Sequence, residues 1–184
     1  MIAAVVLAAG SSRRLGRPKQ TVVIAGETLL ARAIRVAQEA GPSPVIVVVR
    51  DGTDFGLRPR GCVVVVNEEA EEGMAASIRC GVASALHAGA SGVVLMTCDQ
   101  VAVTVEHLRL LCAEPAAAAG SGYAGKVGIP AYFPAASFGE LLQLKGDIGA
   151  REMLRGARVV ATEALGLDVD TEEDVERARV LLEG

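Results

Sequence analysis

Four short apolar runs rich in β-branched residues constrain the fold of this chain most strongly. They do not alternate with polar residues, which is typical of strands covered on both faces, and they span 2–8, 44–49, 62–66 and 93–97. Segments with helical spacing lie between or after them, at 29–37, 75–86 and 105–112. This alternation predicts an α/β fold with three layers, in which a mostly parallel central sheet lies between helices. Ligands of such sheets bind at the carboxyl ends of the strands, so functional residues should follow strands directly.

The second half of the chain is less regular. A hairpin is expected within 123–133, around Gly125 and Lys126, as an insertion after the main sheet. Short helices are expected at 138–144 and 150–154, then a strand at 159–161. Thr171, with Asp174 three residues later, predicts a capped start for a last helix at 172–182. The Ala-rich stretch 116–119 is either the edge of a loop or a short strand.

Composition limits what these elements can form. With 184 residues the chain is expected to form a single domain, 1–184, and a core of small aliphatic residues, because 51% of the residues are hydrophobic but only 3% are aromatic. A net charge of −4 disfavours nucleic acid as a partner. Charged residues, Gly or Pro interrupt every apolar run before about 20 residues, so no membrane span is expected. Four widely spaced cysteines are typical of reduced thiols and indicate a cytoplasmic location.

A loop of small and basic residues follows the first predicted strand. It runs Leu7, Ala8, Ala9, Gly10, Ser11, Ser12, Arg13, Arg14, Leu15, Gly16, Arg17, Pro18, Lys19. Small residues let backbone N–H groups approach a phosphate or the edge of a base, and the cations offset the charge of a triphosphate. A solvated basic turn is the alternative, but it does not explain why small residues and arginines are concentrated at the end of a strand. The loop is not a Walker A motif, since no Lys-Ser or Lys-Thr follows Gly16, and its glycines do not have the dinucleotide-binding spacing.

These features resemble the nucleotidyltransferases of glycosyltransferase-A-like fold, most closely the molybdenum cofactor cytidylyltransferases and their relatives among the molybdopterin guanylyltransferases. The resemblance covers nearly the whole chain and rests on the loop and four further motifs. These are Gly73-Met74-Ala75-Ala76-Ser77, Cys98-Asp99-Gln100, Gly146-Asp147-Ile148-Gly149-Ala150-Arg151 and Asp168-Val169-Asp170-Thr171. Two positions depart from the pattern, because Val101 and Ile129 stand where relatives usually carry Pro and often carry His.

The resemblance implies roles for particular residues. Asp99 would hold a magnesium ion, Mg2+, with Asp170 or Asp168 as a second carboxylate, and Arg14 and Lys19 would bind the triphosphate and act with Asp99 in catalysis. The implied nucleotide-binding residues are Leu7, Ala8, Ala9, Gly10, Ser11, Ser12, Arg13, Arg14, Lys19, Gly73, Ser77 and Asp99. The implied acceptor-binding residues are Gln100, Asp147 and Arg151.

Structural alternatives remain for several of these residues. Asp99 could cap a turn. Asp168 and Asp170 could have a structural role, because Asp residues are favourable near the start of a helix and these two precede the Thr171 cap. The Ser77 hydroxyl could donate a hydrogen bond to a backbone carbonyl of its own helix, and Asp147 could form an ion pair with Arg151. The acidic residues that precede Gly73 are expected to be a solvated surface without chemistry; they are Glu68, Glu69, Glu71 and Glu72. His87 and His107 are expected to be surface or core residues rather than ligands.

The implied reaction transfers a nucleoside monophosphate, CMP from CTP, to the phosphate of a molybdopterin-type acceptor with release of pyrophosphate. GTP is the other nucleotide that the resemblance allows, and a molybdoenzyme is a further partner that it allows. Three alternatives remain: a sugar-1-phosphate nucleotidyltransferase, a nucleotide- or cofactor-binding accessory protein without turnover, and a phosphate-loop ATPase. The absence of a Lys-Ser or Lys-Thr pair after Gly16 disfavours the last of these.

Overall fold

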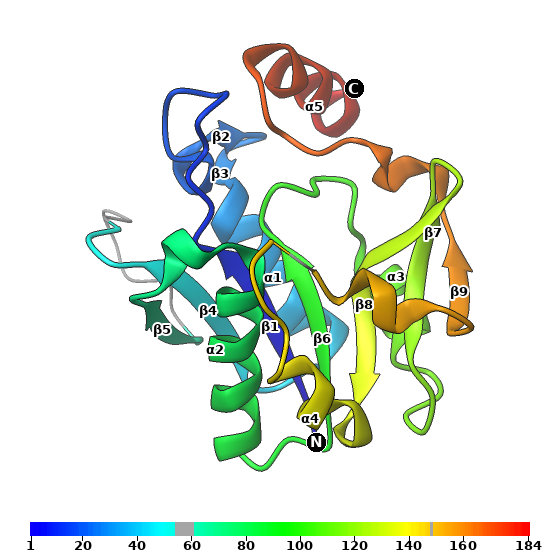
Figure 1. Ribbon diagram of the computed structural model, residues 1–184. Helices are drawn as coiled ribbons and strands as arrows, with labels where there is room; N and C mark the ends of the chain where they lie inside the picture. Colours follow the sequence, from blue (N-terminus) through cyan, green and yellow to red (C-terminus); the bar gives the residue numbers. More distant parts are fainter. Residues whose placement is uncertain (54–60, 148) are drawn as a thin grey trace.

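The computed structural model describes residues 1–53, 61–147 and 149–184, and it is built around one large sheet (Figure 1). The sheet has seven strands in the order β5-β4-β1-β6-β8-β7-β9. Their bounds are β1 Ile2–Ala8, β4 Val45–Arg50, β5 Val63–Asn67, β6 Gly92–Thr97, β7 Ala119–Tyr123, β8 Lys126–Pro134 and β9 Arg158–Ala161. β8 is antiparallel to both of its neighbours, and every other pair in the sheet is parallel. The predicted α/β fold with a mostly parallel central sheet is confirmed.

Helices cover both faces of the sheet and give the molecule three layers (Figure 1). Their bounds are α1 Leu29–Ala40, α2 Met74–His87, α3 Val105–Leu111, α4 Phe138–Leu141 and α5 Glu172–Glu183. α1 and α3 enclose one core with one face of the sheet, while α2 and α4 enclose a second core with the other face. Short 3-10 turns span Lys19–Thr21, Ala70–Glu72, Ala135–Ser137, Ala150–Leu154 and Glu163–Gly166. Within the described ranges, no helix is long and apolar enough to cross a membrane.

Capping and close packing fix the two long crossover helices. The Thr28 hydroxyl accepts a hydrogen bond from the amide of Ala31 at the start of α1, and Gly41 ends that helix in a left-handed conformation (φ 110°). α2 packs against β1 at Gly81, where an added Cβ would lie 2.4 Å from Cγ1 of Val5. Glycine therefore allows a close approach between helix and sheet that a side chain would prevent.

The predicted hairpin exists, but its place in the fold differs from the expectation. β7 and β8 are joined through Ala124 and Gly125, which both have positive φ, as two-residue hairpin turns require. The hairpin is part of the main sheet rather than an insertion after it, because β8 pairs with β6 as well as with β7. A second small hairpin, β2 Val23–Ile24 with β3 Glu27–Thr28, was not predicted, since strands of two residues carry no periodic signal.

The C-terminal segment crosses back over the carboxyl ends of the strands. Thr171 and Asp174 form the predicted capping box at the start of α5, and Val175 and Ala178 bury one face of this helix against the region after β1. Just before α5, Gln100 and Asp168 form an isolated antiparallel bridge. Residues around 99 and 170 are therefore held side by side, although they are distant in the sequence.

Candidate active site

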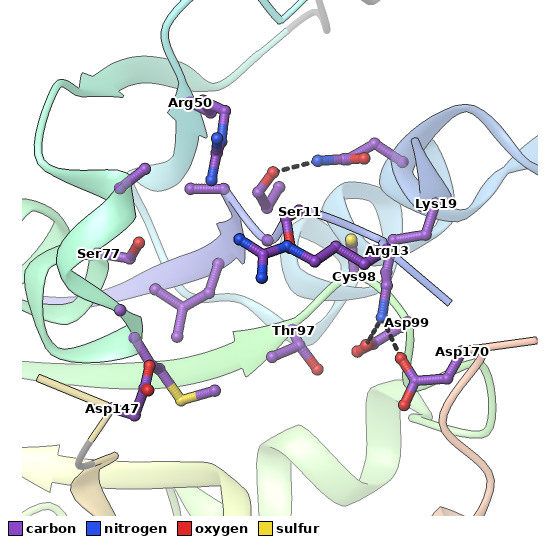
Figure 2. A pocket seen from close by; sticks show the side chains of 18 of the residues that line it. Ser11, Arg13, Lys19, Arg50, Ser77, Thr97, Cys98, Asp99, Asp147 and Asp170 are labelled. Atoms are coloured by element: carbon purple, nitrogen blue, oxygen red, sulfur yellow. Dashed lines mark hydrogen bonds and ion pairs between the residues drawn. The ribbon is translucent and has the colours of Figure 1, made fainter. Parts of the chain in front are cut away.

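A cavity of about 600 Å³ lies at the carboxyl ends of β1, β4 and β6 (Figure 2). It is where the predicted architecture would put a ligand. The predicted nucleotide-binding residues that line it are Leu7, Ala8, Ala9, Gly10, Ser11, Arg13, Lys19, Gly73, Ser77 and Asp99. Asp147 and Asp170, predicted for the acceptor and the metal, also line it. Segments that are far apart in the sequence thus converge on one cavity.

The ammonium group of Lys19 lies between the carboxylates of Asp99 and Asp170. Its Nζ is 2.7 Å from Oδ2 of Asp99 and 2.6 Å from Oδ1 of Asp170, and only 13% of the Lys19 side chain is exposed (Figure 2). Burial alone would lower the pKa of Lys19, but the two carboxylates outweigh it, so the pKa lies above the usual 10.5. Lys19 is therefore a permanent cation that marks the point on which both carboxylates converge.

Backbone and side-chain contacts hold this group of charges in place. The carbonyl oxygen of Asp99 accepts hydrogen bonds from the amides of Val101 and Val169, each 3.1 Å away. On the loop side, the amide of Lys19 donates to the hydroxyl oxygen of Ser12 at 3.1 Å. Arg14 forms an ion pair with Asp170, and 72% of its own side chain is exposed. Ser12 and Arg14 do not line the cavity, but both contact residues that do.

Asp168 does not line the cavity; it precedes Asp170 by two residues, and its backbone forms the bridge to Gln100. It makes no ion pair among the described residues. Surrounding protein removes part of its solvation, and the carboxylates of Asp99 and Asp170 repel its charge, so its pKa is raised to about 6. Of the two carboxylates predicted as a partner for Asp99, Asp170 shares a cation with it and Asp168 does not.

The three predicted acceptor residues lie in three different surroundings. Asp147 faces the cavity beside Gly73, where an added Cβ would be 2.3 Å from its Oδ1. Gln100 is buried, and its Nε2 donates to the carbonyl oxygen of Ile129 at 2.9 Å, away from the cavity. Arg151 lines a second, open cavity of about 520 Å³ near β8 and β9. No ion pair joins Asp147 and Arg151 in the described structure, and Ile148 of the same motif lies outside the described residues.

Some residues that line the cavity were assigned no individual role from the sequence. Gln20 is buried and donates from Nε2 to the carbonyl oxygen of Ala8, which ties the turn after Lys19 to the end of β1. Arg50 ends β4, and Glu71 belongs to the 3-10 turn before α2. A single arginine after a strand and one glutamate in an acidic run carry no local signal. The rule that ligands bind at strand ends could have identified Arg50.

The carboxylates suit a hard divalent cation. Asp99 and Asp170 already turn their oxygens toward one cation, and carboxylate oxygens are preferred ligands of such ions. Within the described residues, no group of three or more His, Cys, Asp or Glu side chains is arranged to hold a metal. Two carboxylates fit an ion that takes its other ligands from phosphate oxygens and water, as magnesium does in nucleotide sites.

The family of the chain follows from comparison with known proteins. A model of the MobA-like NTP transferase domain matches residues 4–164, a range that holds the cavity except for Asp170. The chain belongs to this family of nucleotidyltransferases.

Individual relatives agree with this membership. Purine catabolism protein PucB of Bacillus subtilis is 32% identical over 193 aligned positions, which cover 95% of this chain and 94% of that protein. A probable molybdenum cofactor guanylyltransferase of Opitutus terrae is 35% identical over 102 positions, or 55% of this chain and 50% of that protein. The crystal structure of Rv0371c from Mycobacterium tuberculosis has a TM-score of 0.85 at 36% identity and 97% coverage of both chains. A manganese complex of Rv0371c has a TM-score of 0.79 at 34% identity, again with 97% coverage of both chains.

Proposed function

We propose that this nucleotidyltransferase transfers CMP from CTP to the phosphate of a molybdopterin-type acceptor and releases pyrophosphate. The observation that carries the proposal is the Lys19 ammonium between Asp99 and Asp170, at one end of a cavity walled by the loop after β1. A buried cation beside carboxylates and backbone N–H groups suits a triphosphate that must be held and neutralised. Transfer between phosphates depends on alignment and charge neutralisation more than on a strong base.

The charged groups around Lys19, together with Arg13 and Asp147, then have roles in the reaction. A phosphate oxygen of the acceptor attacks the α-phosphorus, and the bond from that phosphorus to the leaving pyrophosphate breaks. Lys19 and Arg13 offset the charge of the phosphates, and the backbone of 8–11 lies against the nucleotide. Arg14 releases Asp170 and binds the leaving group from the rim. Asp147, on the opposite wall, is our candidate for contact with the acceptor.

We assign a magnesium ion to Asp99 and Asp170, with Asp168 as an additional carboxylate close to both. Once bound, the ion neutralises charge on the phosphate oxygens. The manganese complex of the similar mycobacterial protein supports a divalent cation in this family. Lys19, freed from the carboxylates, is then available to the phosphates.

The choice of CTP rests on the resemblance of 7–14 and 73–77 to the cytidylyltransferases. GTP is the second candidate, because one relative is named a probable guanylyltransferase. The acceptor is inferred from the same name and from the resemblance.

A matrix of substrates tests the proposal. Pyrophosphate release would be measured with magnesium and each of CTP, GTP, UTP and ATP, against molybdopterin and against a sugar 1-phosphate. We expect release with CTP and molybdopterin. Release only with GTP would move the assignment to the second candidate, and release only with the sugar phosphate would overturn the acceptor. Nucleotide binding without pyrophosphate release from any pair would indicate an accessory role.

A further inference from the structure

An ion pair between Arg50 and Glu71 forms part of the cavity wall and has no place in the reaction described above. Arg50 extends from the end of β4, and its Nη1 contacts Oε1 of Glu71. The two side chains are 35% and 73% exposed, so the arginine is held mostly within the wall while the glutamate lies at its opening. Nε of Arg50 is shielded from solvent and has no hydrogen-bond partner within the described residues. An unsatisfied buried donor of this kind calls for an explanation.

This pair lies at the end of the cavity that is away from the phosphate-binding charges. Figure 2 shows Arg50 and Ser77 on one side of the cavity, with Lys19, Asp99 and Asp170 on the other. A nucleotide whose phosphates lie at Lys19 therefore extends its base toward Arg50. Because this inference places a nucleotide in the cavity, it rests on the proposed function.

Hydrogen bonds next to the pair anchor the turn that carries Glu71. The Asn67 side chain donates from Nδ2 to Oγ of Ser77 at 3.0 Å and accepts from the amide of Glu69 at 3.0 Å. Asn67 and Ser77 are both buried, so the turn that carries Glu71 is anchored to β5 and to α2. Ser77 Oγ accepts from Asn67 and donates to no acceptor among the described residues, so its hydrogen is available to a ligand in the cavity that Ser77 lines.

We propose that Arg50 and Glu71 recognise the base, with the guanidinium donating to O2 and N3 of cytosine and the carboxylate accepting from the N4 amino group. Cytosine presents two acceptors followed by a donor along this edge. The wall presents arginine donors next to a carboxylate acceptor, which is the complementary order. The ion pair keeps both groups in position before the base arrives.

The same arrangement discriminates against uracil. Uracil differs at two adjacent atoms of this edge, because N3 carries a hydrogen and the amino group is replaced by the oxygen O4. The N3–H then faces an arginine donor, and O4 faces the carboxylate of Glu71. A site built around hydrogen bonds rejects a ligand that leaves its polar groups unpaired.

Calorimetric titration of CTP and of UTP tests the inference, since the two nucleotides carry the same ribose and triphosphate. The wild-type chain is expected to bind CTP at least about tenfold more tightly than UTP, as one mispaired hydrogen bond to a charged group would require. In Glu71→Gln the preference should fall toward one, because a glutamine amide can donate to O4. In Arg50→Gln the affinity for CTP should fall by about tenfold, and the affinity for UTP by less.

Arg179→Gln provides the matched control. Arg179 forms an ion pair with Glu176 on α5, so its loss removes the same charge and a similar contact away from the cavity. This variant should keep the wild-type preference, and thermal unfolding of all variants should show that they remain folded.

Several outcomes would overturn the inference: no preference in the wild type, a preference for GTP over CTP, or a CTP-to-UTP ratio in Glu71→Gln within about twofold of the wild type. Pyrophosphate release separates this inference from the proposed function. Release from CTP with an unchanged ratio in Glu71→Gln overturns base recognition alone. Selective CTP binding that depends on the pair, without release to any acceptor, overturns the proposed reaction alone.

Discussion

The amide of Val169 donates a hydrogen bond to the carbonyl oxygen of Asp99 at 3.1 Å. This contact joins the loop after β6 to the segment that enters α5, and it brings the next carboxylate along the chain, Asp170, to the same ammonium as Asp99. Each aspartate supplies one of the two carboxylate contacts to the Lys19 ammonium group. The site therefore depends on a tertiary contact between two parts of the chain that are 70 residues apart.

Replacing Lys19 should change metal affinity and turnover in opposite directions. In Lys19→Met, a divalent cation no longer has to displace an ammonium ion from Asp99 and Asp170, so the affinity for manganese without nucleotide should rise by roughly tenfold. Pyrophosphate release should fall by at least about 100-fold, because the phosphates lose a preorganised positive charge. Electron paramagnetic resonance of free manganese would measure the first effect. Lys126→Met, at the exposed first residue of β8, is the control and should change neither quantity.

The contact between α2 and β1 predicts a large effect from a single methyl group. In Gly81→Ala the new Cβ would lie 2.4 Å from Cγ1 of Val5 and 3.1 Å from Cγ2 of Val48, both of which belong to buried residues. Overpacking of this kind should lower the free energy of unfolding by about 1–3 kcal/mol. In Gly139→Ala, the control, nothing lies within 4 Å of the new Cβ, and the stability should not fall. Urea denaturation of both variants measures the difference, and equal stability of the two would contradict the packing.

Burial of His107 predicts a pH dependence of stability. His107 is held against Ser121 with its Nε2 2.7 Å from the hydroxyl oxygen, and burial lowers its pKa below the ordinary 6.5. The unfolded chain therefore binds a proton more readily than the folded chain, so this residue lowers stability as the pH falls below 6.5 toward the folded pKa. The difference in unfolding free energy between wild type and His107→Gln should change over this window and be constant above it. A difference that does not vary with pH would contradict the inferred burial of a neutral imidazole.

Local sequence patterns predicted the parallel core well. β1, β4 and β6 are continuous apolar runs, and their burial on both faces follows from that composition. β5 has the same composition, but the expectation that it is covered on both faces was wrong, because it is an edge strand with Val63 and Val66 46% and 47% exposed. The position of β8 between β6 and β7 could not be predicted, because it depends on pairing between distant segments rather than on the hairpin's own residues. The two-residue strands β2 and β3 are too short for any periodicity.

The site could be predicted only in part, for similar reasons. The loop from Leu7 to Lys19 combines small and basic residues in one stretch, so it was recognisable without a structure. Gln100 was expected to contact the acceptor, but its amide is turned to the carbonyl oxygen of Ile129, a direction that depends on where β8 lies. Arg50 and Glu71 face the cavity only because β4 and the turn before α2 end beside each other.

The most direct test of the central claim compares the wild-type chain with Asp99→Asn. The substitution removes one carboxylate charge and almost no volume, so circular dichroism should show an unchanged fold. With CTP, magnesium and molybdopterin, the wild type should release pyrophosphate together with a cytidylylated product, and Asp99→Asn should release it at least about 100-fold more slowly. Equal rates in the two proteins would show that the cation between Asp99 and Asp170 does not mark the reaction centre.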